Sequence, residues 1–190
     1  MATDHAISTL SLALRSLLLD ARPTAGDIKD AGVELYLADS FKTPMALGIS
    51  IFLYRTTVST ARRNLPPKIG PDGKKYRPPL PLDLHYMITP WAKKAETQHL
   101  LLAWCMRVLD DSPTLGSGYL NSFDPEDEPF GADETVDLVF EPTSIQDMLS
   151  IWEVGKPNIQ VSATYVARVV PIDSRVRLPD PGGRPVQTRI

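Results

Sequence analysis

The chain has 190 residues, of which 43% are hydrophobic and 23% are charged, a balance typical of a globular protein that can bury a core. Its formal net charge of −3 disfavours a dedicated nucleic-acid binder. The single cysteine, Cys105, excludes an internal disulfide and a cysteine-based zinc site, and it fits a reducing compartment.

The apolar residues near the N-terminus predict a helix rather than a targeting or membrane segment. Residues 4–20 carry apolar side chains at three- and four-residue steps, with Asp4 as a possible N-cap and Arg22-Pro23 as the stop. Arg15 interrupts the run, and no positively charged leader or cleavage site accompanies it, which disfavours a signal peptide. No run approaches the roughly 18 apolar residues of a transmembrane helix. We therefore expect no membrane insertion and a cytoplasmic location, unless the protein leaves as part of a larger particle.

Two β-strands are predicted next. Residues 33–37 (VELYL) alternate with period two, which places Val33, Leu35 and Leu37 on one face. Residues 47–58 (LGISIFLYRTTV) carry bulk on both faces and many β-branched or aromatic residues, which is typical of an interior strand covered on both sides. The connection between the two strands is short enough to make them a hairpin or a neighbouring pair.

Residues 62–81 differ in composition from the segments around them. They hold six prolines, a Pro71-Asp72-Gly73 turn signal, and six basic residues against one acidic residue. A loop of this length is uncommon within a compact domain and is usually functional or disordered. We weigh a solvated, mobile excursion equally against a docking loop.

The second half of the chain alternates between strands and helices. A strand is expected at 82–89, stopped by Pro90-Trp91, and a helix with spaced apolar residues is expected at 94–110. Further strands are expected at 136–140 and at 162–172.

A short helix is expected between these last two strands. Pro142-Thr143-Ser144 opens it, Asp147 is placed to complete a capping arrangement, and Gly155-Lys156-Pro157 ends it. The apolar face of this helix is expected to consist of Ile145, Met148, Leu149 and Trp152.

The elements together predict an α+β fold. We expect a single domain over residues 1–173, with a mixed β-sheet packed by about three helices and a long basic, Pro-rich loop. Residues 174–190 are rich in Pro, Gly and Arg, and they are expected to form an extended C-terminal arm that packs poorly by itself.

Residue patterns of known enzyme classes are missing from the sequence. The chain has no P-loop, dinucleotide-binding, zinc-protease or G-x-S-x-G motif. Ser117, in Gly116-Ser117-Gly118, is expected in a loop without the setting of a nucleophile, and Cys105 is expected to be a buried, inert thiol. His5, His85 and His99 have no carboxylate or cysteine at ligand spacing. We therefore expect no enzyme activity, no cofactor and no metal ligand set.

Acidic residues gather at 124–134, where no basic residue interrupts them. A solvated acidic loop is favoured over a calcium loop, because the ligand spacing is wrong and Pro125 and Pro129 break the geometry. A basic loop, an acidic loop and a basic arm on one small chain suit ordered contact between copies or with neighbours. The candidate interface residues are Arg62, Arg63, Lys68, Lys74, Lys75, Arg77, Asp124, Glu126, Asp127, Glu128, Arg175, Arg177, Arg184 and Arg189.

Several short segments also have a recognisable order and spacing. They are Phe52–Arg55, Arg63-Asn64, Pro81–Pro90, Glu96, His99–Leu101, Met106, Leu109–Asp111, Ser150–Trp152 and Ser162–Tyr165. This ordered set resembles the N-terminal domain of the cap, or tail-terminator, proteins of phage-tail-like contractile injection systems, such as the Photorhabdus virulence cassette and the antifeeding prophage. The resemblance runs from Ile7 to Ile172, and no pattern matches beyond that point.

This resemblance implies a non-enzymatic structural protein. Members of the family form a six-fold ring at the tail end distal to the baseplate, where they contact the inner tube and the sheath, stop their growth and anchor the sheath during contraction. The implied partners are other copies in a hexameric ring and the sheath and inner-tube proteins, with no nucleic acid. Within such a ring, we expect the acidic loop of one copy to face the basic loop of the next, and the arm to add a strand to a neighbour's sheet.

Three alternatives remain open at this point. A head–tail connector or other phage-tail completion protein shares the logic of the ring but docks to a portal. A small hydrolase would use Ser117 or Cys105 and would need a base beside the nucleophile. A nucleic-acid binder would use the Arg-rich arm and the basic loop, with strongly salt-dependent binding.

Overall fold

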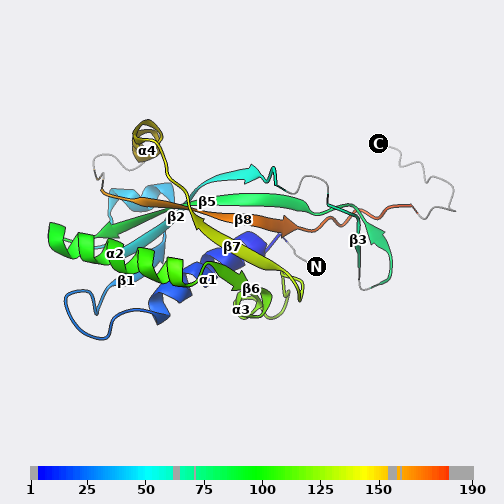
Figure 1. Cartoon of the computed structure of the whole chain (residues 1–190), viewed down its shortest axis with the longest axis horizontal. Coiled ribbons are helices and arrows are strands. Elements are labelled where there is room, and N and C mark those ends of the chain that lie inside the picture. Colours follow the sequence, from blue (N-terminus) through cyan, green and yellow to red (C-terminus); the bar gives the residue numbers. More distant parts are fainter. Residues whose placement is uncertain (1–3, 62–64, 71, 154–157, 159, 180–190) are drawn as a thin grey trace.

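The computed structural model describes residues 4–61, 65–70, 72–153, 158 and 160–179. Six strands form one sheet and two short strands form a separate hairpin (Figure 1). The elements in chain order are α1 (Ala6–Asp20), β1 (Gly32–Leu35), the 3-10 helix η1 (Ala38–Lys42), β2 (Gly48–Val58), β3 (Lys68–Ile69), β4 (Lys75–Tyr76), β5 (Leu80–Trp91), α2 (Ala95–Asp111), β6 (Thr114–Gly116), α3 (Ser117–Asn121), β7 (Thr135–Phe140), α4 (Ile145–Trp152) and β8 (Ala163–Ile172).

The large sheet is mixed and lies between two apolar layers. Its strand order is β1-β2-β5-β8-β7-β6, with β1 parallel to β2 and the remaining neighbours antiparallel. Residues of α1, α2 and α3 join one face of the sheet in the main hydrophobic core. Residues of η1 and α4 join the other face in a smaller, largely aromatic cluster. The predicted α+β class is therefore confirmed.

Strand β2 has apolar neighbours on both faces, as its sequence predicts. Ile49 and Ile51 are buried in the main core, whereas Phe52 and Tyr54 pack against the aromatic cluster on the opposite face. In the sheet, β2 lies between β1 and β5, so its backbone is paired along both edges. Full burial of an Ile side chain contributes about 1.5–3 kcal/mol, which makes this strand a main source of stability.

The two long helices confirm the predictions for residues 4–20 and 94–110, with one correction at the first helix. Asp4 is not the N-cap of α1, because His5 occupies that position and makes no side-chain capping hydrogen bond. The Asp4 carboxylate instead lies 2.8 Å from Nη2 of Arg175. Neither of these helices, nor any other in the described part of the chain, is long and apolar enough to cross a membrane.

The predicted strand at 33–37 ends two residues early. β1 stops at Leu35, the Tyr36 ring is buried in the aromatic cluster, and Leu37 is 76% exposed. The period-two alternation fails because the chain turns into η1 directly after Tyr36. The neighbouring-pair alternative for these two strands is confirmed, since β1 and β2 pair in parallel and not as a hairpin.

Strand β5 continues through Pro90-Trp91, where the sequence predicts a stop. β8 pairs with β5 only as far as Ile88. On the β8 side of β5, therefore, no neighbouring strand requires a hydrogen bond from residue 90, where proline has no N–H to donate. The Pro90 carbonyl accepts a hydrogen bond from Nε2 of Gln98 at 3.1 Å. The extended strand brings Trp91 into the aromatic cluster.

Helix α4 is held to the sheet mainly by its last residue. Trp152 is 1% exposed, and its ring centroid lies 5.6 Å from that of Phe41. The predicted N-cap is confirmed, because the Asp147 N–H donates to Oγ of Ser144 at 3.1 Å. The predicted apolar face is wrong at two positions: Ile145 is 79% exposed and Leu149 is 50% exposed, since α4 packs by its C-terminal end.

A β-bulge interrupts the pairing of strands β5 and β8. Their register shifts between Leu82 and Leu84, and Val169 on the opposite strand has a φ of 59°. The Val169 N–H donates to Oδ1 of Asp83 at 2.9 Å, which holds this left-handed conformation in place. Bulges of this kind bend a strand and increase its twist, and here the bend lies where β5 and β8 lead to the hairpin.

Candidate interaction surface

The basic segment contains a β-hairpin, where the sequence predicts only a loop. β3 and β4 pair through Lys68 with Tyr76 and Ile69 with Lys75, and the Gly70 N–H donates to the Lys74 carbonyl at 2.9 Å. Gly73 adopts a φ of 71°, as the predicted turn requires. Arg62 and Arg63, two of the candidate interface residues, lie outside the described residues.

The beginning of the C-terminal arm pairs with this hairpin. The Arg77 N–H donates to the Val176 carbonyl at 2.9 Å, and the Leu178 N–H donates to the Lys75 carbonyl at 2.8 Å. Tyr76 and Arg177 form an antiparallel bridge. Residues 176–178 therefore pair with β4 as a short third segment, and we name this segment together with β3 and β4 the arm sheet. Arg184 and Arg189 lie outside the described residues.

Arg177 is fixed within the arm sheet by two contacts. Its guanidinium carbon lies 5.9 Å from the centre of the Tyr76 ring, a cation–π arrangement. Its Nη2 lies 3.2 Å from Oδ2 of Asp72, a residue of the hairpin turn. The charge of Arg177 is thus partly neutralised within its own chain.

A partly buried ion-pair cluster lies at the base of the arm sheet. Nζ of Lys68 is 2.8 Å from Oδ2 of Asp173 and 2.9 Å from Oε1 of Glu134. Partial burial lowers the pKa of Lys68, but the hydrogen bonds to Asp173 and Glu134 outweigh it and leave that pKa raised. The basic and acidic segments of the sequence therefore meet within a single chain.

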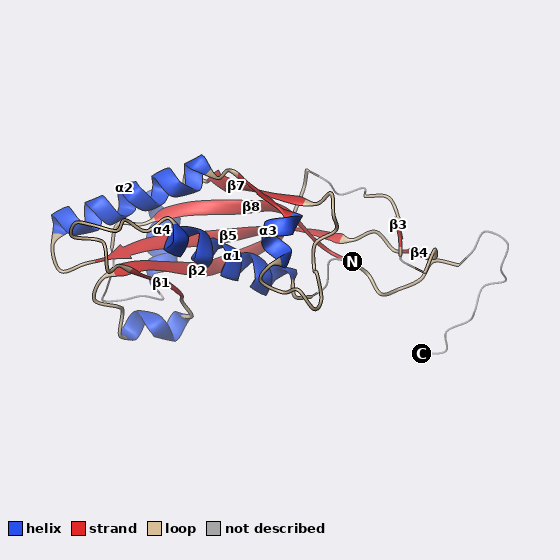
Figure 2. Ribbon diagram, turned by 90° about the horizontal axis from the view of Figure 1, so that it is seen from below, coloured by secondary structure: helices blue, strands red, loops and turns tan. Residues whose placement is uncertain are grey.

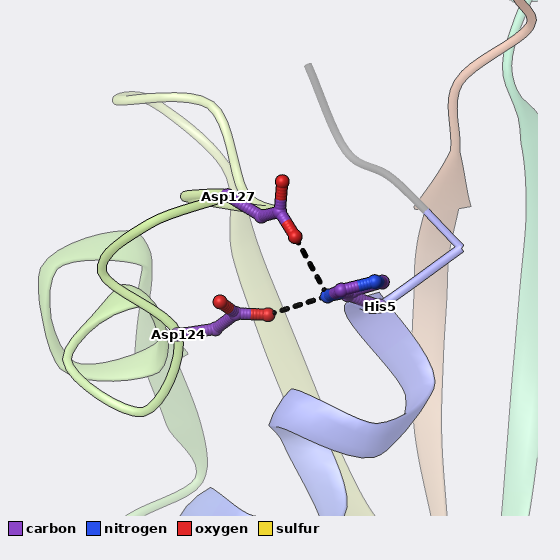
Figure 3. Close-up of side chains that lie close together, drawn as sticks. All are labelled: His5, Asp124 and Asp127. Carbon is purple, nitrogen blue, oxygen red and sulfur yellow. Dashed lines mark hydrogen bonds and ion pairs between the residues drawn. The ribbon is translucent and has the colours of Figure 1, made fainter.

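A second cluster joins the acidic segment to the N-terminus, as Figure 3 shows. Nδ1 of His5 lies 2.8 Å from Oδ2 of Asp124 and 2.9 Å from Oδ2 of Asp127. The hydrogen bond to Asp124 and the charge of Asp127 raise the pKa of His5 above its ordinary value. The three side chains are close enough to ligate a cation. A search for metal ligands at close spacing in the sequence cannot find this cluster, because His5 and Asp124 are 119 positions apart.

Three exposed cations of the hairpin segment form no ion pair within the described part of the chain, although the charge of Lys74 helps to lower the pKa of Asp72. Lys74, Lys75 and Arg77 are exposed, and none of them forms an ion pair with another described residue. The same holds for Glu126 and Glu128 in the acidic segment. The structure thus separates the candidate interface residues into those bound within the chain and those still open to a partner.

His85 is hydrogen-bonded to Glu141, a residue that lines a polar cleft. The His85 ring is buried, with Nδ1 2.7 Å from Oε2 of Glu141 and Nε2 3.0 Å from Oγ1 of Thr57. Both ring nitrogens are therefore occupied, which indicates a structural role. The adjacent cleft of about 360 Å³ is lined by residues that include Tyr54, Glu141 and Asp147. His99 lies exposed on α2.

The two candidate nucleophiles are both engaged in the fold. Ser117 lies at the junction of β6 and α3, so the prediction that it sits in a plain loop is wrong. Its hydroxyl nevertheless donates to the Ala132 carbonyl at 2.8 Å and is largely buried, so it is not presented to a substrate. Cys105 is fully buried, and burial raises the pKa of its thiol, which disfavours the reactive thiolate.

These features define an α+β domain with a charged arm sheet, and its described residues assemble no catalytic group. The chain belongs to the Pvc16 N-terminal domain family, whose model matches residues 9–188. The match continues past Ile172 into the arm. No curated protein matches the sequence.

Two solved structures share the fold. The sheath/tube terminator of the PVC extracellular contractile injection system, in its extended state, aligns with 96% of this chain and 64% of its own at 15% identity and a TM-score of 0.63. The tube-terminating cap of the anti-feeding prophage aligns with 95% of this chain and 59% of its own at 15% identity and a TM-score of 0.60. The chain thus spans less than two thirds of the length of either structure.

Proposed function

We propose that this protein is a structural terminator, or cap, of a contractile injection system. The observation that carries the proposal is the shared fold, which extends over 96% of the chain and includes a sheath/tube terminator among the structures that match. Membership of the Pvc16 N-terminal domain family supports the same function. The chain would end the inner tube and the sheath and would anchor the sheath end during contraction.

A hexameric ring is the assembly that this function requires. A ring needs two unlike surfaces on each copy, joined head to tail by a rotation that closes. The chain carries unneutralised basic charge on the arm sheet and unneutralised acidic charge on the 124–134 segment, which supplies two such surfaces. The proposed partners are further copies of the chain and the sheath and inner-tube proteins, with assembly in the cytoplasm and no catalytic activity.

Electron microscopy of particles made with and without this protein tests the proposal. Without it, tubes and sheaths are expected to have irregular or runaway lengths, because growth has no stop. With it, density for a ring is expected at one end of each particle. Tubes and sheaths of normal, uniform length in its absence would overturn the proposal.

A further inference from the structure

The arm sheet projects beyond one end of the six-stranded sheet in both views of the molecule (Figures 1 and 2). Its base is anchored by the contacts of Lys68 with Asp173 and Glu134. Its edge is anchored by the backbone hydrogen bonds of Arg77 and Leu178. These anchors hold the turn between β3 and β4 away from the body of its own chain.

The turn end of the arm sheet carries two cations, Lys74 and Lys75, which are exposed and form no ion pair with any described residue. Lys68 and Arg177, two other cations of the arm sheet, are paired with Asp173, Glu134 and Asp72. Arg77 lies at the other end of the hairpin, next to Tyr76, which pairs with Lys68. Two adjacent unpaired cations at the end of a projection are suited to an acidic partner surface.

An acidic cleft of about 230 Å³ lies at the base of the arm sheet. Its charged lining residues are Asp133, Glu134, Asp137 and Arg168. Glu134 forms an ion pair with Lys68, whereas Asp133 and Asp137 are exposed and form no ion pair within the described part of the chain. Asp137 accepts a hydrogen bond from Oγ1 of Thr114 at 2.9 Å, so the cleft offers two carboxylates that lack an ion-pair partner among the described residues.

The tip cannot fill the cleft of its own chain. Leu65 and Pro79, which line the cleft, are the residues where the chain enters and leaves the hairpin, so the cleft lies at the opposite end from Lys74 and Lys75. A tip and a cleft that cannot meet within one copy form the two halves of a head-to-tail contact.

We propose that the arm-sheet tip of one copy, through Lys74 and Lys75, docks at Asp133 and Asp137 in the cleft of the next copy. This inference rests on the proposed ring and identifies the contact that closes it. It differs from a general attraction between the basic and acidic segments, because Asp124 and Asp127 are held by His5 and take no part.

Charge reversal in the purified full-length chain tests the contact, with the oligomeric state read by native mass spectrometry and mass photometry. Lys74→Glu with Lys75→Glu, or Asp133→Lys with Asp137→Lys, should each raise the concentration needed for ring formation about tenfold or more. Combining all four substitutions should restore the rings. Asp27→Lys with Asp30→Lys makes the same charge change as the cleft reversal at two exposed residues between α1 and β1, and it should leave the rings intact.

Disulfide cross-linking gives a second readout that does not depend on the effects of charge on folding. Lys74→Cys and Asp133→Cys are made in separate chains, which are mixed and oxidised; Cys105 is buried and stays unreacted. A cross-linked pair is expected only in the mixture. Rings that form without this cross-link, or a control reversal at Asp27 and Asp30 that is as disruptive as the cleft reversal, would overturn the inference. A chain that stays monomeric yet still sets tube length would overturn the inference and leave the proposed function standing.

Discussion

Nζ of Lys68 and Oδ2 of Asp173 lie 2.8 Å apart, although 105 positions separate the two residues in the sequence. The Asp173 side chain is only 7% exposed and that of Lys68 is 29% exposed, so this ion pair is shielded from solvent. Lys68 is the first residue of β3, and Asp173 directly follows β8. Their ion pair therefore connects the start of the hairpin to the end of a strand of the six-stranded sheet. The orientation of the arm sheet depends on this contact.

Asp173→Ala is expected to reduce the free energy of unfolding by about 1–3 kcal/mol, because it leaves the partly buried Lys68 ammonium with Glu134 alone. Urea denaturation measures the change, and Asp39→Ala, in the exposed pair with Lys42, is a control that should have a smaller effect because solvent screens that pair. Since the pKa of Lys68 is raised above 10.5, the stabilisation is complete at neutral pH. It should be lost only as the pH rises through that raised pKa. Equal effects of the two substitutions would contradict a structural role for the pair.

Shortening the arm should loosen the hairpin. A chain that ends at Ser174 lacks the Val176 carbonyl, so the Arg77 amide should exchange its hydrogen about tenfold faster or more. A chain that ends at Pro179 keeps both backbone hydrogen bonds and serves as the control. Hydrogen exchange read by mass spectrometry or NMR distinguishes them, and equal protection of Arg77 in both would show that the third segment contributes little.

The cluster at His5 should give a measurable titration. An NMR pH titration of the His5 ring is expected to give a pKa above 6.5, because Asp124 and Asp127 stabilise the imidazolium. Asp127→Asn should lower this value, whereas Asp110→Asn on α2 should leave it unchanged. Because the pKa is raised on folding, the stabilisation from this cluster is present below pH 6.5 and is lost as the pH rises through the raised value. A His5 pKa at or below 6.5 in the native chain would refute the cluster.

Backbone strain at Val169 predicts a reversal of the usual preference between glycine and alanine. At a φ of 59° a Cβ is unfavourable, so Val169→Gly should be more stable than Val169→Ala by about 1 kcal/mol. At Val139 on β7, which does not have a positive φ, Ala should be more stable than Gly. Thermal or urea unfolding of the four variants measures both differences, and the same order at both positions would argue against strain.

Much of the fold is predictable from local patterns. The alternation at 82–89, the bulk on both faces of 47–58 and the Ser144 cap all depend on residues close in sequence, and the structure confirms each of them. The ordered short segments also indicated the family correctly. Local geometry and side-chain periodicity are short-range properties, which is why they can be interpreted without a partner.

The interaction surface, in contrast, was decided by tertiary structure. Charge composition marked the basic, acidic and C-terminal segments but could not show that Lys68 binds Asp173, or that His5 binds Asp124 and Asp127. Which charges are neutralised depends on which strands become neighbours and on a bulge at Val169, and these are set by packing over more than a hundred residues. The sequence by itself therefore determined the α+β class, the family and the supply of charge. Only the folded chain decided that Lys68 and Arg177 form ion pairs while Lys74, Lys75 and Arg77 form none with a described residue, because ion pairing acts through space and not along the chain.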